Sequence, residues 1–269
     1  MLITLTTDFG VGEYVAAMKG VIFGINPEAT IIDIDHSVAA QDIRRGAYVL
    51  YAATPWFSEA IHVGVVDPGV GTPRRPIAIQ CEGGVFVGPD NGLLIPAATS
   101  FGIREVRHLT NAEYFVRRAS YVFHGRDLFA PVAAHLSRGV SFSTLGPTIS
   151  DYVRLDFGTP RVDDNGIRGE VLTVDRFGNV IMNIPRGVIA ERWRFNQRLV
   201  VTVGGYELEV PLLRAYGEAP EASLLATISS SGFLEIAKRN GDAATQLGAV
   251  PGVAVSVRRV GGTASFERA

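Results

Sequence analysis

Residues 2–34, LITLTTDFGVGEYVAAMKGVIFGINPEATIIDI, decide the fold of the first half of the chain. Residues 2–6 are rich in apolar and β-branched side chains and predict a strand. Between Val15 and Ile25 the apolar residues recur at spacings of three and four, which predicts a helix with one apolar face. Residues 30–34 predict a second strand. This order of strand, helix and strand indicates a crossover unit within a parallel sheet.

The same alternation continues outward from this stretch. Apolar residues between Ile43 and Leu50 predict a second helix, which ends before Pro55. Residues 61–66 predict a third strand, whose unbroken apolar run is typical of a strand that is buried on both faces. The fold class is therefore α/β, and we expect an α/β/α domain with a mostly parallel sheet over residues 1–160.

The second half of the chain has a different pattern. From residue 166 onward, short β-rich runs are separated by Gly, Asn, Asp or Pro, which is typical of an antiparallel barrel or sandwich. The polar segment 158–166 predicts the boundary, and we expect a smaller antiparallel β-barrel-like domain over residues 166–262. Residues 234–238 predict the start of a helix. The expected strands are 171–174, 180–184, 199–203, 208–210, 224–228 and 253–257.

Composition limits the functional classes. The 269 residues carry a formal net charge of −2, which argues against non-specific nucleic-acid binding. The single cysteine, Cys81, excludes an intrachain disulfide, and the five histidines lack paired metal-ligand spacing, so we expect no bound metal. No apolar run approaches the roughly 20 residues that span a bilayer, and the amino terminus lacks the pattern of a secretory signal. We therefore expect a cytoplasmic protein with no membrane partner.

Two aspartates occupy positions that favour ligand binding. Asp8 follows the first expected strand and Asp67 follows the third, and ligands of open α/β sheets bind at the carboxyl ends of strands. A carboxylate there can accept hydrogen bonds from ribose hydroxyls, or it can simply stabilise a turn. Asp67 opens a glycine-containing loop whose arginines, Arg74 and Arg75, can fold back onto it. His124 precedes a helical pattern, where it can face a cleft and titrate near neutral pH or simply bond to the backbone.

Two turn sequences stand out in the second half. Asp175-Arg176-Phe177-Gly178-Asn179 joins two expected strands, and an ordinary hairpin turn would explain it. Ser229-Ser230-Ser231-Gly232 is also a plausible turn, although consecutive hydroxyls and amides can bind a carboxylate. From the residues alone, both interpretations of each turn stay open.

Five segments of the chain occur together in one known protein family: Thr6–Gly10, Val65–Thr72, Gly88–Gly92, Phe123–Asp127 and Asp175–Asn179. With these segments in the expected order from residue 1 to about 258, the chain resembles the S-adenosyl-L-methionine (SAM) hydrolases, or SAM hydroxide adenosyltransferases. This family is homologous to the SAM-dependent fluorinases and chlorinases. The resemblance implies hydrolysis of SAM to adenosine and L-methionine by attack of water or hydroxide on the ribose 5′ carbon, with no cofactor.

The resemblance also implies a homotrimer and a set of site residues. Each site would lie between the first domain of one subunit and the second domain of its neighbour. Asp67, Arg74 and His124 match the residues that hold the nucleophile, and Arg74 is preferred to Arg75 by its spacing from Asp67. Asp8 would hold the ribose hydroxyls. The expected second-domain contacts are Asn179 to the adenine, Phe177 near the purine, Asp175 and Glu235 to the methionine ammonium, and Ser230 to the methionine carboxylate.

The implied reaction depends mainly on how the oxygen nucleophile is positioned relative to the breaking bond. Methionine leaves the sulfonium as a neutral thioether, so no general acid is required. Fixing the nucleophile in line with the breaking bond can lower the barrier by up to about 7–11 kcal/mol. An arginine beside a carboxylate lowers the pKa of that carboxylate, so we expect Arg74 to keep Asp67 ionised.

Two other functions stay open at this point. A halogenase of the same superfamily would make 5′-halo-5′-deoxyadenosine. Its fluoride-using members carry a hydroxyl residue where Gly125 stands and a tyrosine where Asp67 stands, which disfavours this alternative. A non-catalytic adenosine-binding module would need Asp8 and Asn179 but no residues that hold a nucleophile.

Overall fold

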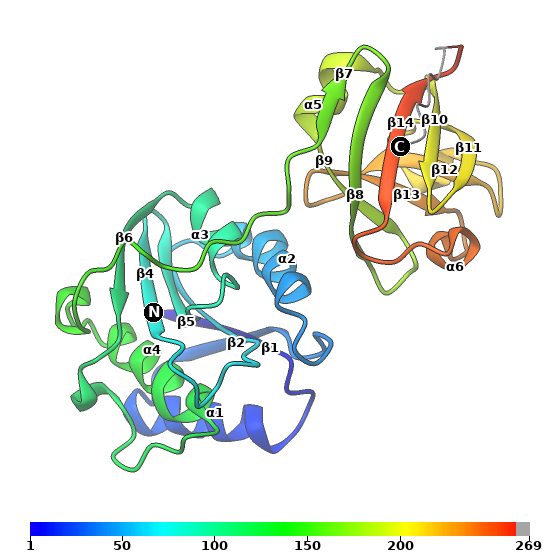
Figure 1. Cartoon of the computed structure of the whole chain (residues 1–269). Coiled ribbons are helices and arrows are strands. Elements are labelled where there is room, and N and C mark those ends of the chain that lie inside the picture. The colour runs from blue at the N-terminus through cyan, green and yellow to red at the C-terminus, as the bar shows by residue number, and fades with distance from the viewer. Residues whose placement is uncertain (262–269) are drawn as a thin grey trace. The chain divides into compact units, whose positions relative to one another are not determined.

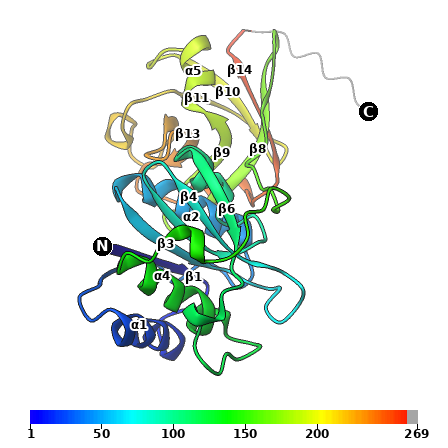
Figure 2. The same cartoon turned by 90° about the vertical axis from the view of Figure 1, so that its left-hand side faces the viewer.

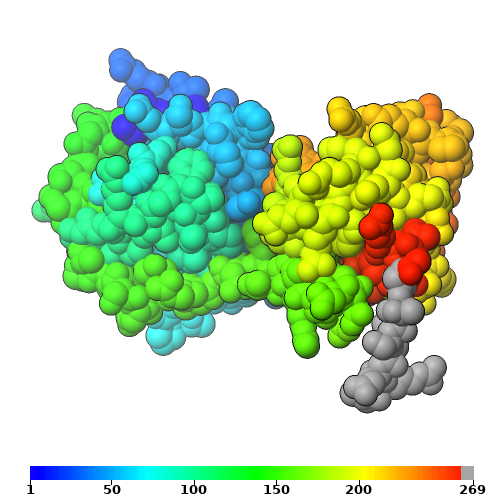
Figure 3. All heavy atoms as spheres, turned by 90° about the horizontal axis from the view of Figure 1, so that it is seen from above, coloured from blue at the N-terminus to red at the C-terminus, as the bar shows by residue number. Residues whose placement is uncertain are grey.

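The computed structural model describes residues 1–261, which Figure 3 colours along the chain. They divide into two compact units, Met1–Asp156 and the part from Phe157 onward (Figure 1). The predicted end of the second domain at residue 262 lies outside the described residues. Within residues 1–261, the helices are all too short or too polar to cross a membrane.

A six-stranded sheet forms the centre of the first unit, in the order β2-β1-β3-β5-β4-β6. Its strands are β1 (Leu2–Thr7), β2 (Thr30–Asp35), β3 (Ala60–Val65), β4 (Pro76–Cys81), β5 (Gly84–Pro89) and β6 (Ile103–His108). The first four strands in this order are mutually parallel, and β4 runs antiparallel to both of its neighbours. The prediction of an α/β fold with a mostly parallel sheet is confirmed.

Helices cover both faces of this sheet (Figures 1 and 2). They are α1 (Glu13–Ile25), α2 (Ile43–Ala53), α3 (Ile95–Ser100) and α4 (Ala130–Ser137), with short helical turns at η1 (Thr54–Trp56), η2 (Ala112–Tyr114), η3 (Gly125–Phe129) and η4 (Phe142–Thr144). Helices α1 and α4 pack on the face that presents Val63 and Val65. On the opposite face Gly64 leaves room for Leu50 of α2, because a Cβ at Gly64 would lie 2.9 Å from that side chain.

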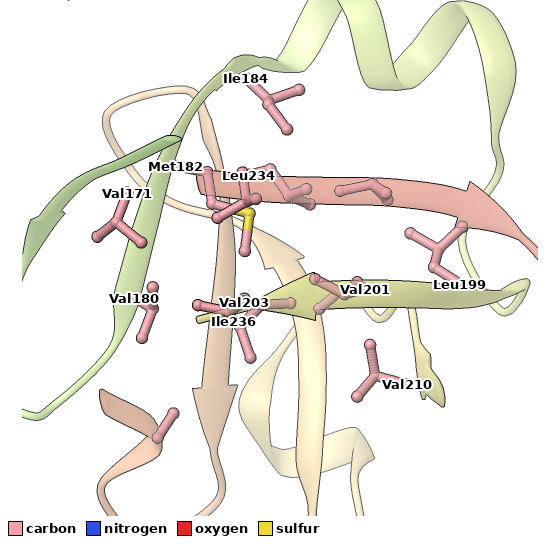
Figure 4. Packing of buried hydrophobic residues seen from close by; sticks show 14 of the residues in the cluster. Val171, Val180, Met182, Ile184, Leu199, Val201, Val203, Val210, Leu234 and Ile236 are labelled. Carbon is pink, nitrogen blue, oxygen red and sulfur yellow. The ribbon is translucent and has the colours of Figure 1, made fainter. Parts of the chain in front are cut away.

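The second unit is an antiparallel sheet in the order β11-β10-β14-β8-β9-β13-β12, with β7 beside β8. The strands are β7 (Arg161–Asp163), β8 (Gly166–Val174), β9 (Val180–Pro185), β10 (Arg198–Val203), β11 (Tyr206–Pro211), β12 (Leu224–Ile228), β13 (Phe233–Lys238) and β14 (Ala254–Arg259); the helical elements are α5 (Arg186–Arg192), η5 (Tyr216–Glu218) and α6 (Ala243–Leu247). An isolated β-bridge between Leu212, which follows β11, and Ala226 of β12 joins the two edge strands of this sheet. Buried Val, Leu, Ile and Met side chains fill the interior (Figure 4). The antiparallel, barrel-like prediction is confirmed.

The prediction of a helix from Leu234 is wrong, because residues 233–238 form strand β13 between β9 and β12. Leu, Glu, Ala and Lys all favour helices, which explains the sequence pattern. Leu234 and Ile236 face the barrel interior, whereas Ala237 belongs to a separate buried cluster, so the strand is buried on both faces. Burial on both faces removes the alternation by which a strand is recognised.

We expect the stability of the first unit to depend on pH through His62. This histidine of β3 is fully buried, its Nδ1 lies 2.9 Å from Thr4 Oγ1, and burial lowers its pKa from 6.5 to about 4. Protons therefore bind preferentially to the unfolded chain, so the stabilisation is fully present above pH 6.5 and is lost as the pH falls through about 4. The shift corresponds to about 3 kcal/mol.

The measurement is urea unfolding of wild type and His62→Gln between pH 7 and pH 4. The variant is expected to lose less free energy of unfolding than wild type across this range. Parallel pH dependences for the two proteins would contradict the assignment to His62.

Candidate active site

The turn after β1 places Asp8 at the edge of the sheet. Strand β1 pairs in parallel with β3, and the Asp8 backbone N–H donates to Val65 at 3.4 Å. The carboxylate oxygen Oδ2 of Asp8 accepts from the backbone N–H of Gln41 at 2.8 Å. Gly10, with φ +70°, donates to the carbonyl of His36 at 2.8 Å. These bonds fix the carboxylate of Asp8 and leave Oδ1 without a partner among the described residues.

The structure brings Asp67, Arg74 and His124 into direct contact. Arg74 donates from Nε to Asp67 Oδ1 at 3.1 Å and from Nη2 to Asp67 Oδ2. The same Nη2 lies 2.9 Å from Nδ1 of His124. The Arg74 and Asp67 side chains are only 7% and 5% exposed, and Nη1 of Arg74 is buried without a partner in the described chain. One guanidinium thus joins a carboxylate and an imidazole.

Burial shifts the pKa values of these groups. Desolvation raises the pKa of the Asp67 carboxyl above its ordinary 3.8, although Arg74, His124 and the Gly69 backbone oppose the rise. Arg74 lowers this pKa as expected, but desolvation outweighs the arginine, so the net shift is upward. Burial and the charge of Arg74 lower the pKa of His124, which keeps the imidazole neutral at neutral pH.

Arg75 has a separate role. Its guanidinium donates to Asp90 from Nε at 2.9 Å and to Asp151 from Nη1 at 2.8 Å. Asp90 in turn accepts the Val153 backbone N–H at 2.8 Å. Arg75 thus anchors the segment after η4 to the sheet, whereas Arg74 is the arginine that contacts Asp67.

A pocket of about 440 Å³ opens beside these groups. Phe9, Tyr14 and Phe123 form one of its walls, with ring centroids 5.2–5.7 Å apart. The full lining is Asp8, Phe9, Tyr14, Ala40, Gln41, Val65, Asp67, Pro68, Val70, Val122, Phe123, His124 and Gly125. The pocket therefore combines two carboxylates and an imidazole with an apolar wall.

In the second unit, Asp175 organises the turn between β8 and β9. Its carboxylate accepts the backbone N–H groups of Phe177 at 2.8 Å and Asn179 at 2.9 Å, and the Asn179 side-chain amide at 2.9 Å. Asn179 is 7% exposed, whereas the Phe177 ring is 70% exposed. The turn therefore joins a buried amide and a half-buried carboxylate to an exposed aromatic residue.

The neighbouring strand β13 contributes a buried carboxylate. Glu235 is 2% exposed and accepts a hydrogen bond from the Tyr216 hydroxyl at 2.8 Å. Burial raises the pKa of Glu235, and the charge of Asp175 adds to the rise. Neither carboxylate forms an ion pair with a cation in residues 1–261.

The serine turn between β12 and β13 holds Ser230 at the surface. Ser229 Oγ lies 2.9 Å from Ser231 Oγ and accepts the Phe233 backbone N–H at 3.2 Å. Ser230 is exposed, and its hydroxyl has no partner in the described part of the chain. The outer two serines therefore stabilise the turn and leave the middle hydroxyl free.

Sequence reasoning missed Gln41 and Tyr216. Gln41 has φ +68°, a conformation that favours glycine or asparagine, so its residue type gave no signal. Tyr216 reaches Glu235 across 19 positions of sequence, which no local pattern predicts. The described residues contain no group of three or more His, Cys, Asp or Glu side chains arranged to hold a metal ion.

Comparison with known proteins identifies relatives over most of the chain. The model of the SAM hydroxide adenosyltransferase N-terminal domain matches residues 3–146, and that of the C-terminal domain matches residues 169–256. A protein of Salinispora arenicola named (R)-S-adenosyl-L-methionine hydrolase is 41% identical over 254 residues, covering 93% of this chain and 95% of its own. The crystal structure of an uncharacterized conserved protein from Thermotoga maritima has a TM-score of 0.91 and 39% identity, and covers 96% of this chain and 100% of its own. A fluorinase of Nocardia brasiliensis is more distant, at 26% identity over 96% of both chains.

The Asp175–Asn179 turn provides a test by glycine substitution. Gly178 has φ +78°, and a Cβ there would lie 2.2 Å from Asp242 Oδ1. We expect Gly178→Ala to lower the free energy of unfolding of the second unit by about 1–3 kcal/mol, through backbone strain and this clash.

Gly187 of α5 is the matched control for this substitution. It has no positive φ and nothing within 4 Å of a built Cβ, so Gly187→Ala is expected to stabilise by up to about 1 kcal/mol. Urea unfolding of both variants gives the comparison. Equal effects of the two substitutions would contradict the account of the turn.

Proposed function

Because the chain belongs to the SAM hydroxide adenosyltransferase family, we propose that it hydrolyses S-adenosyl-L-methionine to adenosine and L-methionine. The observation that carries this proposal is the contact of Arg74 with both Asp67 and His124, which line a pocket together with Asp8. The reaction needs an oxygen nucleophile held in line with the 5′ carbon, and these groups offer both donors and acceptors for a water molecule.

His124 orients the nucleophile as a hydrogen-bond donor. A guanidinium has only donors, so Nδ1 of His124 accepts from Arg74 and the ring hydrogen is on Nε2. The lowered pKa of His124 agrees with this neutral form. In this tautomer Nε2–H can bind the water oxygen but cannot take its proton.

Asp67 is therefore the group that takes the proton from water. Each carboxylate oxygen accepts one bond from Arg74 and retains lone-pair capacity for another hydrogen. The raised pKa makes Asp67 a stronger base than an ordinary aspartate. The positive charge of Arg74, held beside Asp67 and His124, favours the developing hydroxide electrostatically.

Asp8 binds the ribose. Gln41 holds one carboxylate oxygen, and the other is free to accept from the sugar hydroxyls. This places the sugar at the carboxyl ends of β1 and β3, where Asp67 also lies. Methionine departs as a neutral thioether, so no further acid is needed on the leaving side.

The second domain supplies the remaining substrate contacts, from a neighbouring copy in a homotrimer. The half-buried Asp175 and the buried Glu235 have no cationic partner in the described chain, and the methionine ammonium would supply one. Asn179 binds the adenine, and the exposed ring of Phe177 packs near the purine. The free hydroxyl of Ser230 donates a hydrogen bond to the methionine carboxylate. Two points stay predictions. One is that domain 1–160 binds the nucleoside and carries the catalytic residues, while domain 166–262 completes the site of a neighbouring subunit. The other is the cytoplasmic location.

Purified protein supplied with SAM alone is expected to release adenosine and methionine. In water labelled with heavy oxygen, the label is expected in the 5′ hydroxyl of the adenosine, because the C5′–O bond is the one formed. Adding a chelator is expected to leave the rate unchanged. Adenosine without label would contradict direct attack by water, and a 5′-halo product in chloride or fluoride would favour the halogenase instead.

Asp67→Asn and His124→Ala test the nucleophile-holding groups. Each is expected to lower kcat by roughly 10²–10⁴. The dissociation constant for adenosine is expected to change little, because Asp8 holds the ribose. His135→Gln, on α4 and outside the pocket lining, serves as a histidine control with unchanged kcat. Wild type that binds adenosine without turning over SAM would favour a non-catalytic binding module.

A further inference from the structure

The motif His124-Gly125-Arg126-Asp127 contains two charged residues that the proposed reaction does not use. Asp127 is fully buried, and its carboxylate accepts from Arg126 Nε at 2.5 Å and Arg126 Nη2 at 2.8 Å. It also accepts the backbone N–H of Ser120 at 2.7 Å. A buried carboxylate with three charge-assisted or backbone bonds is a strong local anchor.

These bonds tie down the segment 116–124 at several points. The Asp127 carbonyl accepts the backbone N–H of Val116 at 2.9 Å, and the Asp127 N–H donates to the Phe123 carbonyl at 3.1 Å. With the bond to Ser120, the beginning, middle and end of the segment are all attached to one residue. The segment has no other regular structure, so its shape depends on these attachments.

The anchored segment forms one side of the pocket. The Arg126 guanidinium stacks on the Phe123 ring at 5.0 Å, and that ring packs against Phe9 and Tyr14. Val122 and Phe123 line the pocket directly. The segment also approaches the Asp67 loop, because a Cβ at Gly71 would lie 3.0 Å from the Tyr121 carbonyl.

The chain continues from this segment into the π-helical turn η3 immediately after His124. Turns of this kind are rare and often occur at functional sites. Gly125 fits beneath Phe9 and Phe123, where a Cβ would lie 3.2 Å and 3.3 Å from the two rings. Arg126 and Asp127 belong to the turn that directly follows His124, so this turn sets the backbone direction at His124.

We propose that the Arg126–Asp127 pair is a positioning unit that holds segment 116–124, and with it Phe123 and His124, in the geometry needed for turnover. In this proposal the pair does not contact the substrate. It affects turnover only by positioning Phe123 and His124, which line the pocket. The effect on turnover rests on the proposed SAM hydrolase function, whereas the attachment of the segment does not.

The attachment is tested without substrate. Arg117 and Arg118 are exposed within the segment and are trypsin sites. Asp127→Asn and the milder Arg126→Gln are expected to increase the rate of trypsin cleavage after these residues by about tenfold, because local opening becomes easier. Glu105→Gln is the matched control, since Glu105 also bonds to a nearby arginine, Arg107, but lies on β6 outside the pocket. Mass spectrometry identifies the cleaved bond, and the melting temperature shows that each variant is folded.

The consequence for catalysis is tested with SAM. Both single variants are expected to lower kcat by about tenfold or more, with a smaller change in the dissociation constant for adenosine, because Asp8 is untouched. The double variant is expected to lose no more than the worse single variant, since the two residues act as one unit. A purely structural role would lower the melting temperature and leave kcat per folded molecule intact.

The outcomes separate the two proposals. Cleavage at the wild-type rate in both variants, or unchanged kcat despite faster cleavage, overturns the positioning role. Wild type that fails to hydrolyse SAM overturns the proposed function, and faster cleavage in the same experiment still supports the attachment. Additive losses in the double variant would show that the residues act separately and would also overturn the proposal.

Discussion

The site of the first unit depends on one buried guanidinium. Arg74 is the only link in the described chain between the carboxylate of Asp67 and the imidazole of His124, which lie 57 positions apart in sequence. Burial makes the charged form of a carboxylate costly unless a cation lies beside it, and an imidazole with a free Nδ1 could adopt either tautomer. Arg74 resolves both problems, because its planar fork donates to two acceptors at once. Lysine could not reproduce this arrangement, since its three N–H donors share one nitrogen and cannot form a forked pair with the carboxylate.

The sheet brings these groups to one place. Because β1 and β3 are adjacent and parallel, with Thr7 opposite Val65, the chain leaves both strands at the same edge. Asp8 and Asp67 are therefore neighbours although 59 positions separate them. The same edge receives His124 from the turn before α4, through the anchored segment 116–124. The pocket is thus a consequence of strand order, and its charge is a consequence of which residues follow the strands.

Much of this could be predicted from local pattern. Helices α1 and α2 and strands β1 to β3 have strong periodicity or continuous apolar runs, and the short strands of the second unit are separated by turn residues. Strand β13 has the sequence pattern of a helix, because its residues favour helices and both of its faces are buried. Strands β4, β5 and β6 were not identified. The contacts of Gln41 and Tyr216 with the site carboxylates were also missed, because each is made between segments that no sequence spacing relates.

The sequence by itself determined the fold class, the order of the elements and the identity of the residues at the strand ends, because these follow from periodicity and from local turn chemistry. The sequence also favoured Arg74 over Arg75 as the partner of Asp67. Only the tertiary structure decided in which direction the pKa of the Asp67 carboxyl moves and which hydrogen-bonding atoms remain free. These properties depend on burial and on distances between segments remote in sequence. Desolvation is a property of the packed interior, and for Asp67 it outweighs the charge of the adjacent arginine.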